Sequence, residues 1–82
     1  MDQFVYSPKS LGSAIKRQRK EKKLSQTEAG RAFNVDQTTI SSIEQGASGT
    51  RLGTLFRLLA ALDLELVIRP KKIGASTNKE GW

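Results

Sequence analysis

The 82-residue sequence predicts a small all-α domain of four helices followed by one short β-strand. Two observations predict this fold class. Apolar residues recur every three to four positions across residues 8–62, which is the period of helices that pack on one face. Across residues 64–69 the period changes to two, which is typical of a strand. A chain of this length forms one domain with a single small core.

The first predicted helix begins after Ser7 and ends near Lys22. Serine accepts a hydrogen bond from a free backbone N–H, and Pro8 fits the first helical position because its missing N–H would have no partner there. Cations in the last turn suit the negative end of the helix dipole. The residues expected to face the core are Leu11, Ala14, Ile15 and Gln18. The polar face carries Lys16, Arg17, Arg19, Lys20, Lys22 and Lys23.

Two short helices are predicted next. Ser25 and Glu28 have the spacing of a capping box, in which each side chain binds the other residue's backbone N–H. Asn34 tolerates the left-handed conformation that ends a helix, and Asp36 is the expected N-cap of the third helix. The apolar residues of these two helices are Ala29, Ala32, Phe33, Ile40 and Ile43.

The fourth predicted helix runs from about Arg51 to Leu62 and is the most hydrophobic element. Its apolar stripe consists of Leu52, Leu55, Phe56, Leu59 and Leu62, with Leu58 beside it. Because this stripe must pack against the other helices, we expect a core that contains Phe33, Leu55, Phe56 and Leu59.

Residues 64–70 form the predicted strand, which Pro70 ends. A single strand cannot satisfy its own backbone hydrogen bonds, so its expected partner is the same strand of a second copy. Residues 4–6 of the same chain are the alternative partner. A short chain with a small core also gains stability from a partner subunit. The expected dimerisation residues are Leu64, Leu66, Val67 and Ile68.

The two short helices and their turn have the plan of a helix-turn-helix. The second helix of that motif enters the major groove, and its exposed front must be narrow and polar. Gln37 can bind adenine through two hydrogen bonds, and Thr38 can touch a thymine methyl. Ser41 lies one turn later on the same face, so these three residues are the expected base contacts. The expected contacts to the DNA backbone are Ser25, Gln26, Thr39, Ser42, Arg17, Arg19 and Lys23.

One carboxylate of the third helix is expected to have a structural role. Glu44 lies where it can pair with a cation, and the candidates are Arg17 and Arg31. Such a pair would hold the third helix in place rather than contact DNA.

The net charge of +6 is unevenly distributed. Residues 1–23 carry seven lysines and arginines against Asp2 and Glu21, whereas acidic residues outnumber basic ones across residues 24–49. This asymmetry predicts a polyanionic partner, double-stranded DNA. The alternative is that the lysines of the first helix form an ordinary solvated face.

The composition argues against several classes of function. The chain has no cysteine and no histidine, so neither disulfides nor a zinc site is expected, and no other cofactor is implied. It lacks a P-loop and the length to enclose a substrate pocket, which argues against an enzyme. No apolar run approaches the ~18 residues of a membrane span, and the N-terminus lacks the layout of a signal peptide. We therefore expect a soluble cytoplasmic protein.

Residues 24–46, LSQTEAGRAFNVDQTTISSIEQG, resemble the helix-turn-helix of the Xre/Cro/phage-repressor family. The family pattern is L-T-Q-x-x-L-A-x-x-x-G-V-x-x-x-T-I-S-x-x-E-x-G, and the matching residues are Leu24, Gln26, Val35, Thr39, Ile40, Ser41, Glu44 and Gly46. The resemblance covers about residues 8–63. It implies a λ-repressor-like fold of four to five helices and a dimeric repressor.

Three departures from the family pattern stand out. Ala29-Gly30 replaces Leu-Ala, and glycine should weaken the second helix by about 1 kcal/mol relative to alanine. Asn34 stands in place of glycine, which the left-handed turn tolerates. Asp36 brings a negative charge near the expected groove, where it can cap the helix but cannot bind phosphate.

The ends of the chain resemble the antitoxins of HipA/HipB toxin–antitoxin modules. The shared features are an opening like YSP, a strand in place of a fifth helix, and a polar tail that ends in tryptophan. This resemblance implies paired C-terminal strands in a dimer that binds operator palindromes, represses its own operon and neutralises a HipA-like kinase toxin through Trp82. The expected organisation is an N-terminal arm (1–7), a DNA-binding domain (8–63), a dimerisation strand (64–70) and a flexible tail (71–82). The alternatives are a stand-alone Xre-type or phage-type repressor, and a protein-binding module that acts through its tail.

Overall fold

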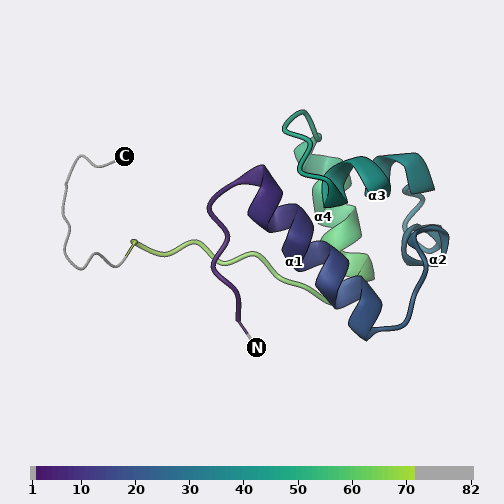
Figure 1. The fold of residues 1–82 in the computed structure, drawn as a ribbon, viewed down its shortest axis with the longest axis horizontal. Helices are drawn as coiled ribbons and strands as arrows, with labels where there is room; N and C mark the ends of the chain where they lie inside the picture. Colours follow the sequence, from purple (N-terminus) through teal and green to yellow (C-terminus); the bar gives the residue numbers. More distant parts are fainter. Residues whose placement is uncertain (1, 72–82) are drawn as a thin grey trace.

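The computed structural model describes residues 2–71, which contain four helices. They are α1 (Pro8–Glu21), α2 (Gln26–Arg31), α3 (Gln37–Glu44) and α4 (Leu52–Ala61). In the view of Figure 1, α1 lies below α3, α2 lies to the right of both, and α4 lies behind α1 and α3. An arm, residues 2–7, precedes α1, and residues 64–71 leave the end of α4 along an elongated path. Within residues 2–71, no helix has the length and apolar character that crossing a membrane requires.

The predicted helix starts are confirmed. The Ser7 hydroxyl accepts a hydrogen bond from the backbone N–H of Ser10 at 3.0 Å. At α2, Ser25 and Glu28 form the expected capping box, with N···O distances of 2.8 and 3.0 Å. The Ser25 backbone N–H binds the Glu28 carboxylate and thereby lowers the pKa of that group. These caps satisfy backbone donors that the helices leave free.

The start of α3 and the turn before it also follow the sequence pattern. Asp36 accepts a hydrogen bond from the backbone N–H of Thr39 at 2.8 Å, which lowers the pKa of the Asp36 carboxyl. Asn34 has a φ of 58°, the left-handed conformation expected for it. The bend between α2 and α3 is therefore defined by local side-chain chemistry.

The core lies where α4 meets the other helices. Its buried apolar residues are Ile15, Ala29, Val35, Ile40, Ile43, Leu55, Leu58, Leu59 and Leu62. Leu11, Leu24 and Leu64 pack against its edge. The largest side chains that are fully enclosed come from three different helices and from the residue after α4: Ile15, Ile40, Leu58 and Leu62.

The expected aromatic contribution to the core is wrong. Phe33 is 40% exposed and Phe56 is 48% exposed, and Leu52 at the start of α4 is 69% exposed. Successive residues of a helix point about 100° apart, so a helix that turns Leu58 and its neighbours inward cannot also bury Phe56. The apolar stripe predicted for α4 is therefore wider than the face that the helix buries, which contains Leu55, Leu58 and Leu59.

Two glycines permit close backbone contacts between elements. A Cβ atom at Gly30 would lie 1.9 Å from the carbonyl oxygen of Val35, and one at Gly12 would lie 2.3 Å from that of Ile43. Such distances are far inside van der Waals contact, so only glycine fits without movement of the backbone. Gly30, interpreted from sequence as a weakness in α2, is therefore what lets α2 meet the turn that leads into α3.

The predicted strand is not present in the described chain. Residues 64–71 contain no strand, and residues 65–71 form no backbone–backbone hydrogen bond with any described residue. A strand exists only with a ladder partner, and a single chain offers none here. The alternative partner, residues 4–6, contacts this segment through side chains alone: Arg69 lies over Phe4 and Lys71 over Tyr6. Pairing across a dimer stays a prediction, and residues 72–82 of the predicted tail, including Trp82, lie outside the described residues.

Replacing Gly30 with alanine should lower the free energy of unfolding by about 1–3 kcal/mol, because the added methyl group forces the Val35 carbonyl away. Thermal unfolding followed by circular dichroism measures the change. Gly53→Ala is the matched control, since Gly53 is also helical and its Cβ would meet no atom within 4 Å. That variant should gain about 0.5–1 kcal/mol from helix propensity. Equal effects of the two substitutions would contradict the close contact.

Candidate nucleic-acid interface

The residues expected to contact bases share the front of α3. Gln37 and Thr38 are exposed in its first turn, and Ser41 is half-buried one turn later. Residues three and four apart are neighbours on a helix surface, so these side chains form one short polar face. Of the expected backbone contacts on this helix, Thr39 is half-buried and Ser42 is exposed.

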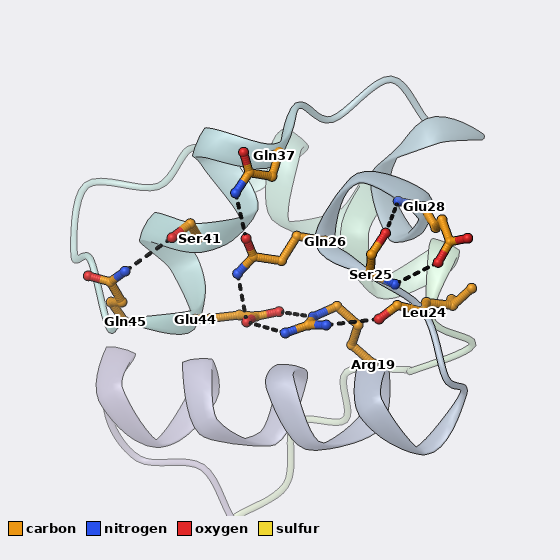
Figure 2. Close-up of polar contacts among 9 residues, drawn as sticks. All are labelled: Arg19, Leu24, Ser25, Gln26, Glu28, Gln37, Ser41, Glu44 and Gln45. Atoms are coloured by element: carbon orange, nitrogen blue, oxygen red, sulfur yellow. Dashed lines mark hydrogen bonds and ion pairs between the residues drawn. The ribbon is translucent and has the colours of Figure 1, made fainter.

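Gln37 is connected to the core by a chain of hydrogen bonds (Figure 2). Its Nε2 donates to Oε1 of Gln26 at 2.8 Å, and Nε2 of Gln26 donates to Oε1 of Glu44 at 3.1 Å. Because a carboxylate only accepts, Gln26 must turn its amide N–H₂ toward Glu44 and its carbonyl oxygen toward Gln37. Within residues 2–71, Gln37 then keeps its own carbonyl oxygen and one N–H free. Those are the two groups that recognise adenine in the major groove.

Glu44 anchors this chain through a buried ion pair with Arg19. The two hydrogen bonds are Nε–Oε2 at 2.6 Å and Nη2–Oε1 at 3.0 Å, and both residues are less than a tenth exposed. Arg19 also donates to the Leu24 carbonyl at 2.8 Å. Three donor groups of the guanidinium are therefore bound within the protein, between α1, α3 and the turn into α2.

This geometry corrects two expectations. Arg19, expected to contact the DNA backbone, is buried, and each of its three guanidinium nitrogens already donates a hydrogen bond within the protein. Glu44, expected to pair with Arg17 or Arg31, pairs with Arg19 instead. The reason is the orientation of α1, which turns Gly12, Ile15 and Arg19 toward the interior.

The ion pair sets the protonation of both groups. Burial disfavours the charged form of Glu44, but the hydrogen bonds from Arg19 and Gln26 outweigh burial and lower the pKa of the carboxyl. The hydrogen bond to Glu44 raises the pKa of Arg19 further above its ordinary value. Both groups are thus charged at neutral pH.

The other expected backbone contacts are not all brought together. Ser25 uses its hydroxyl in the α2 cap, and Gln26 is half-buried between Gln37 and Glu44. Lys23 is exposed in the turn before α2, with a φ of 58°. Arg17 donates to the Gln3 side chain from the outer side of α1, about half a helical turn from Arg19, so it does not join the α3 face.

One polar residue of this surface was not predicted from the sequence. Gln45, exposed at the end of α3, donates a hydrogen bond to the Ser41 hydroxyl at 3.0 Å (Figure 2). The signal was its four-residue spacing from Ser41, which makes the two side chains neighbours. Within residues 2–71, no three His, Cys, Asp or Glu residues gather into a metal site.

Glu44→Gln should lower the free energy of unfolding at pH 7 by about 3–5 kcal/mol, because it leaves the Arg19 charge buried without a partner. Thermal or denaturant unfolding measures the loss. Glu21→Gln removes an exposed carboxylate of α1 and should change stability by less than about 0.5 kcal/mol. A loss no larger in Glu44→Gln than in this control would contradict the importance of the pair.

The same ion pair should make the native protein sensitive to acid. The pKa of Glu44 is lower in the folded chain than its ordinary value of 4.5, so the unfolded chain binds more protons as the pH falls. The stabilisation is complete above about pH 4.5 and is lost as the pH falls through the lowered pKa. The Tm of the native protein should therefore drop as the pH falls below about 4.5. Glu44→Gln should show a shallower drop, keeping only the part due to groups such as Glu28 and Asp36.

Known proteins resemble this chain in sequence and in overall fold. Residues 15–68 match the helix-turn-helix family. Antitoxin HipB of Escherichia coli K12 is 31% identical over 78 residues, which cover 95% of this chain and 89% of HipB. Among solved structures at 32% identity, a HipA–HipB–O2–O3 complex gives a TM-score of 0.81 over 87% of this chain. A complex of a HipB variant with an O2 20mer gives 0.82 over 88%, and each match covers 100% of the solved chain. The chain therefore belongs to the Xre-type helix-turn-helix family, among the HipB-like proteins.

Proposed function

We propose that this protein is a sequence-specific DNA-binding repressor and the antitoxin of a type II toxin–antitoxin module. It binds an operator palindrome as a homodimer, represses its own operon and neutralises a HipA-like serine/threonine kinase toxin. The observation that carries the proposal concerns Gln37, which lies on an exposed polar helix face. Among the described residues it keeps two hydrogen-bonding groups free, and hydrogen bonds through Gln26 connect it to the core. The likeness to HipB over most of the chain supports the antitoxin role.

On DNA, the N-terminal half of α3 enters the major groove. Gln37, Thr38 and Ser41 contact base edges, because their short polar side chains match the donor and acceptor patterns of that groove. Contacts to the DNA backbone come from Ser25, Gln26, Thr39, Ser42 and Lys23, whereas Arg17 lies away from this face. Two such helices in a symmetric dimer read half-sites about one helical turn apart, ~34–36 Å, or a multiple of it.

The dimer forms through residues 64–70. Leu66, Val67 and Ile68 are 52%, 68% and 90% exposed in the single chain, so they offer apolar surface that a second copy can cover. Leu64 joins the dimerisation residues while it packs on the edge of the core. Dimerisation also places two α3 helices on one operator.

Toxin binding is assigned to the tail. Trp82 is the proposed contact residue, since tryptophan is enriched among the residues that dominate protein interfaces. The role is regulatory rather than enzymatic, and it is exercised in the cytoplasm, where a kinase toxin acts.

Gln37→Ala should weaken binding to the operator by about 1–3 kcal/mol and relax the preference at one base position. The reason is the loss of a two-point contact to one base. Fluorescence anisotropy with duplexes from the region upstream of the gene, each with one base pair changed, measures both effects. An unchanged base preference in Gln37→Ala would remove this residue from base recognition.

The matched control for that measurement is Lys23→Asn. Asparagine tolerates the left-handed conformation of residue 23, so the substitution removes a charge with little backbone strain. It should weaken binding about equally for all sequences and reduce the slope of log K against log salt by about 0.9. A change in base preference in this variant would contradict its assignment to the DNA backbone.

The antitoxin role is tested by capture of the kinase. The full chain should bind a HipA-like kinase encoded beside it and suppress the toxicity of that kinase, whereas a variant that ends at Pro70 should bind it more weakly. Both forms should still bind the operator, because the truncation spares residues 8–70. Operator binding without kinase binding by either form would favour the alternative, a stand-alone repressor.

A further inference from the structure

The arm and the C-terminal segment present a shared apolar surface. Of the nine large hydrophobic residues exposed within residues 2–71, six lie here: Phe4, Val5, Tyr6, Leu66, Val67 and Ile68. The backbone N–H and C=O groups of residues 65–71 form no backbone hydrogen bonds within the described chain. An elongated segment with free backbone groups and apolar side chains is a template for pairing with another strand.

The side chains of this segment are arranged symmetrically about Val67. Glu65 precedes it by two residues and Arg69 follows it by two, while Leu66 and Ile68 flank it directly. We propose that a second copy of this chain pairs with residues 64–70 in an antiparallel ladder whose two-fold axis passes through Val67. This proposal rests on the homodimer of the proposed function and adds the register of its strands.

In this register opposite charges face each other. Glu65 lies opposite Arg69 of the partner subunit, and by symmetry Arg69 lies opposite the partner's Glu65. Leu66 lies opposite the partner's Ile68, which forms two apolar pairs on the other face of the ladder. Directly opposite side chains are the pairs that stabilise an antiparallel ladder, and opposite charges favour it.

Pro70 determines which pairs exchange hydrogen bonds. Directly opposite residues alternate between hydrogen-bonded and non-hydrogen-bonded pairs. If Val67 forms a hydrogen-bonded pair with its own copy, then Glu65 and Arg69 do so as well, and Leu64 and Pro70 form a non-hydrogen-bonded pair. Pro70 has no N–H to donate, so it fits that position.

Neighbouring registers are less favourable. An axis at Leu66 places Glu65 opposite the partner's Val67, so Glu65 forms no charge pair. It pairs Leu64 with the partner's Ile68, although Leu64 already packs against the core of its own chain. An axis at Ile68 places Val67 opposite the partner's Arg69, although it brings Glu65 opposite Lys71 of the partner subunit. Both registers lose the two Leu66–Ile68 pairs, and only the axis at Val67 keeps a charge pair together with those apolar pairs.

The arm holds the cations of the segment in place. The guanidinium carbon of Arg69 lies 5.0 Å from the centre of the Phe4 ring, and Nζ of Lys71 lies 4.8 Å from that of Tyr6. The two rings are nearly parallel, at 6°. Because both contacts repeat every two residues, the arm follows the face of the segment that carries Glu65 and Val67. The Phe4 ring therefore holds Arg69 on the face where the partner's Glu65 arrives.

Cysteine scanning tests the register directly, because the chain contains no cysteine. Under mild oxidation of the full-length protein, Val67→Cys should form a disulfide with its own copy. Leu66→Cys and Ile68→Cys should not do so alone, since diagonal Cα atoms are ~7–8 Å apart, but a mixture of the two should crosslink. Self-crosslinking that is fastest at residue 66 or 68 would overturn the register.

Charge exchange is the second test. Glu65→Arg and Arg69→Glu should each raise the dimer dissociation constant about tenfold, because like charges then face each other. The double variant should restore dimerisation, as measured by sedimentation equilibrium. Phe4→Leu, which keeps an apolar side chain but removes the ring face, should weaken the dimer less than either charge reversal does. A double variant as weak as the single ones would overturn the charge pairing.

Different results would exclude the dimer and the strand register. Wild-type protein that stays monomeric would remove the dimer from the proposed function as well as this register. Wild-type protein that dimerises while the Val67→Cys variant fails to crosslink would remove the register alone. Residues 65–69 are exposed, and an unchanged helical circular dichroism signal in each variant shows that the domain is folded.

Discussion

The buried pair of Arg19 and Glu44 is the interaction on which the domain depends most. It joins α1 to α3 through two hydrogen bonds, and the same guanidinium also binds the chain just before α2. Three of the four helices are thus positioned by one charged cluster in a core that is otherwise aliphatic. A buried ion pair adds little net stability compared with apolar packing, but its geometry is demanding. We infer that its main contribution is to fix the angle at which α3 leaves the domain.

The two close glycine contacts complement this ion pair. Gly12 allows the backbone of α1 to approach the end of α3, beside Glu44, and Gly30 allows α2 to approach the turn before α3. The helix proposed to read DNA is therefore held from both sides by backbone contacts that no side chain can replace.

The sequence predicted what depends on local chemistry. The caps at Ser7, Ser25 and Asp36 and the left-handed turn at Asn34 each require only residues within three positions of one another, and all of them are confirmed. The four helices followed from those caps and from apolar spacing. The polar front of α3 was also readable, because its residue types and spacing carry the signal.

The predictions that were wrong concern contacts between helices or across a turn. Arg19 is one of several cations in α1, and nothing near it in the sequence says that α3 brings a carboxylate to it. Phe56 belongs to a stripe wider than the surface available to bury it, and only the packing of α4 decides which edge stays outside. Gly30 looked like a weakness because the Val35 carbonyl that requires it lies five residues away, beyond a turn. The strand predicted at residues 64–70 would need a second chain as its ladder partner, so a single chain cannot test that prediction.

The link from Gln37 through Gln26 to Glu44 has a consequence for how such a repressor diverges. A residue that reads DNA is usually free to vary, since it is exposed and contributes little to folding. Here the orientation of Gln37 derives from a carboxylate that the core also needs. If Gln37 reads DNA as proposed, a new operator preference at this position would require a matching change at Gln26, and Glu44 could not change without cost to the fold. Duplicated copies of such a gene would acquire new target sequences more readily through Thr38 and Ser41 than through Gln37.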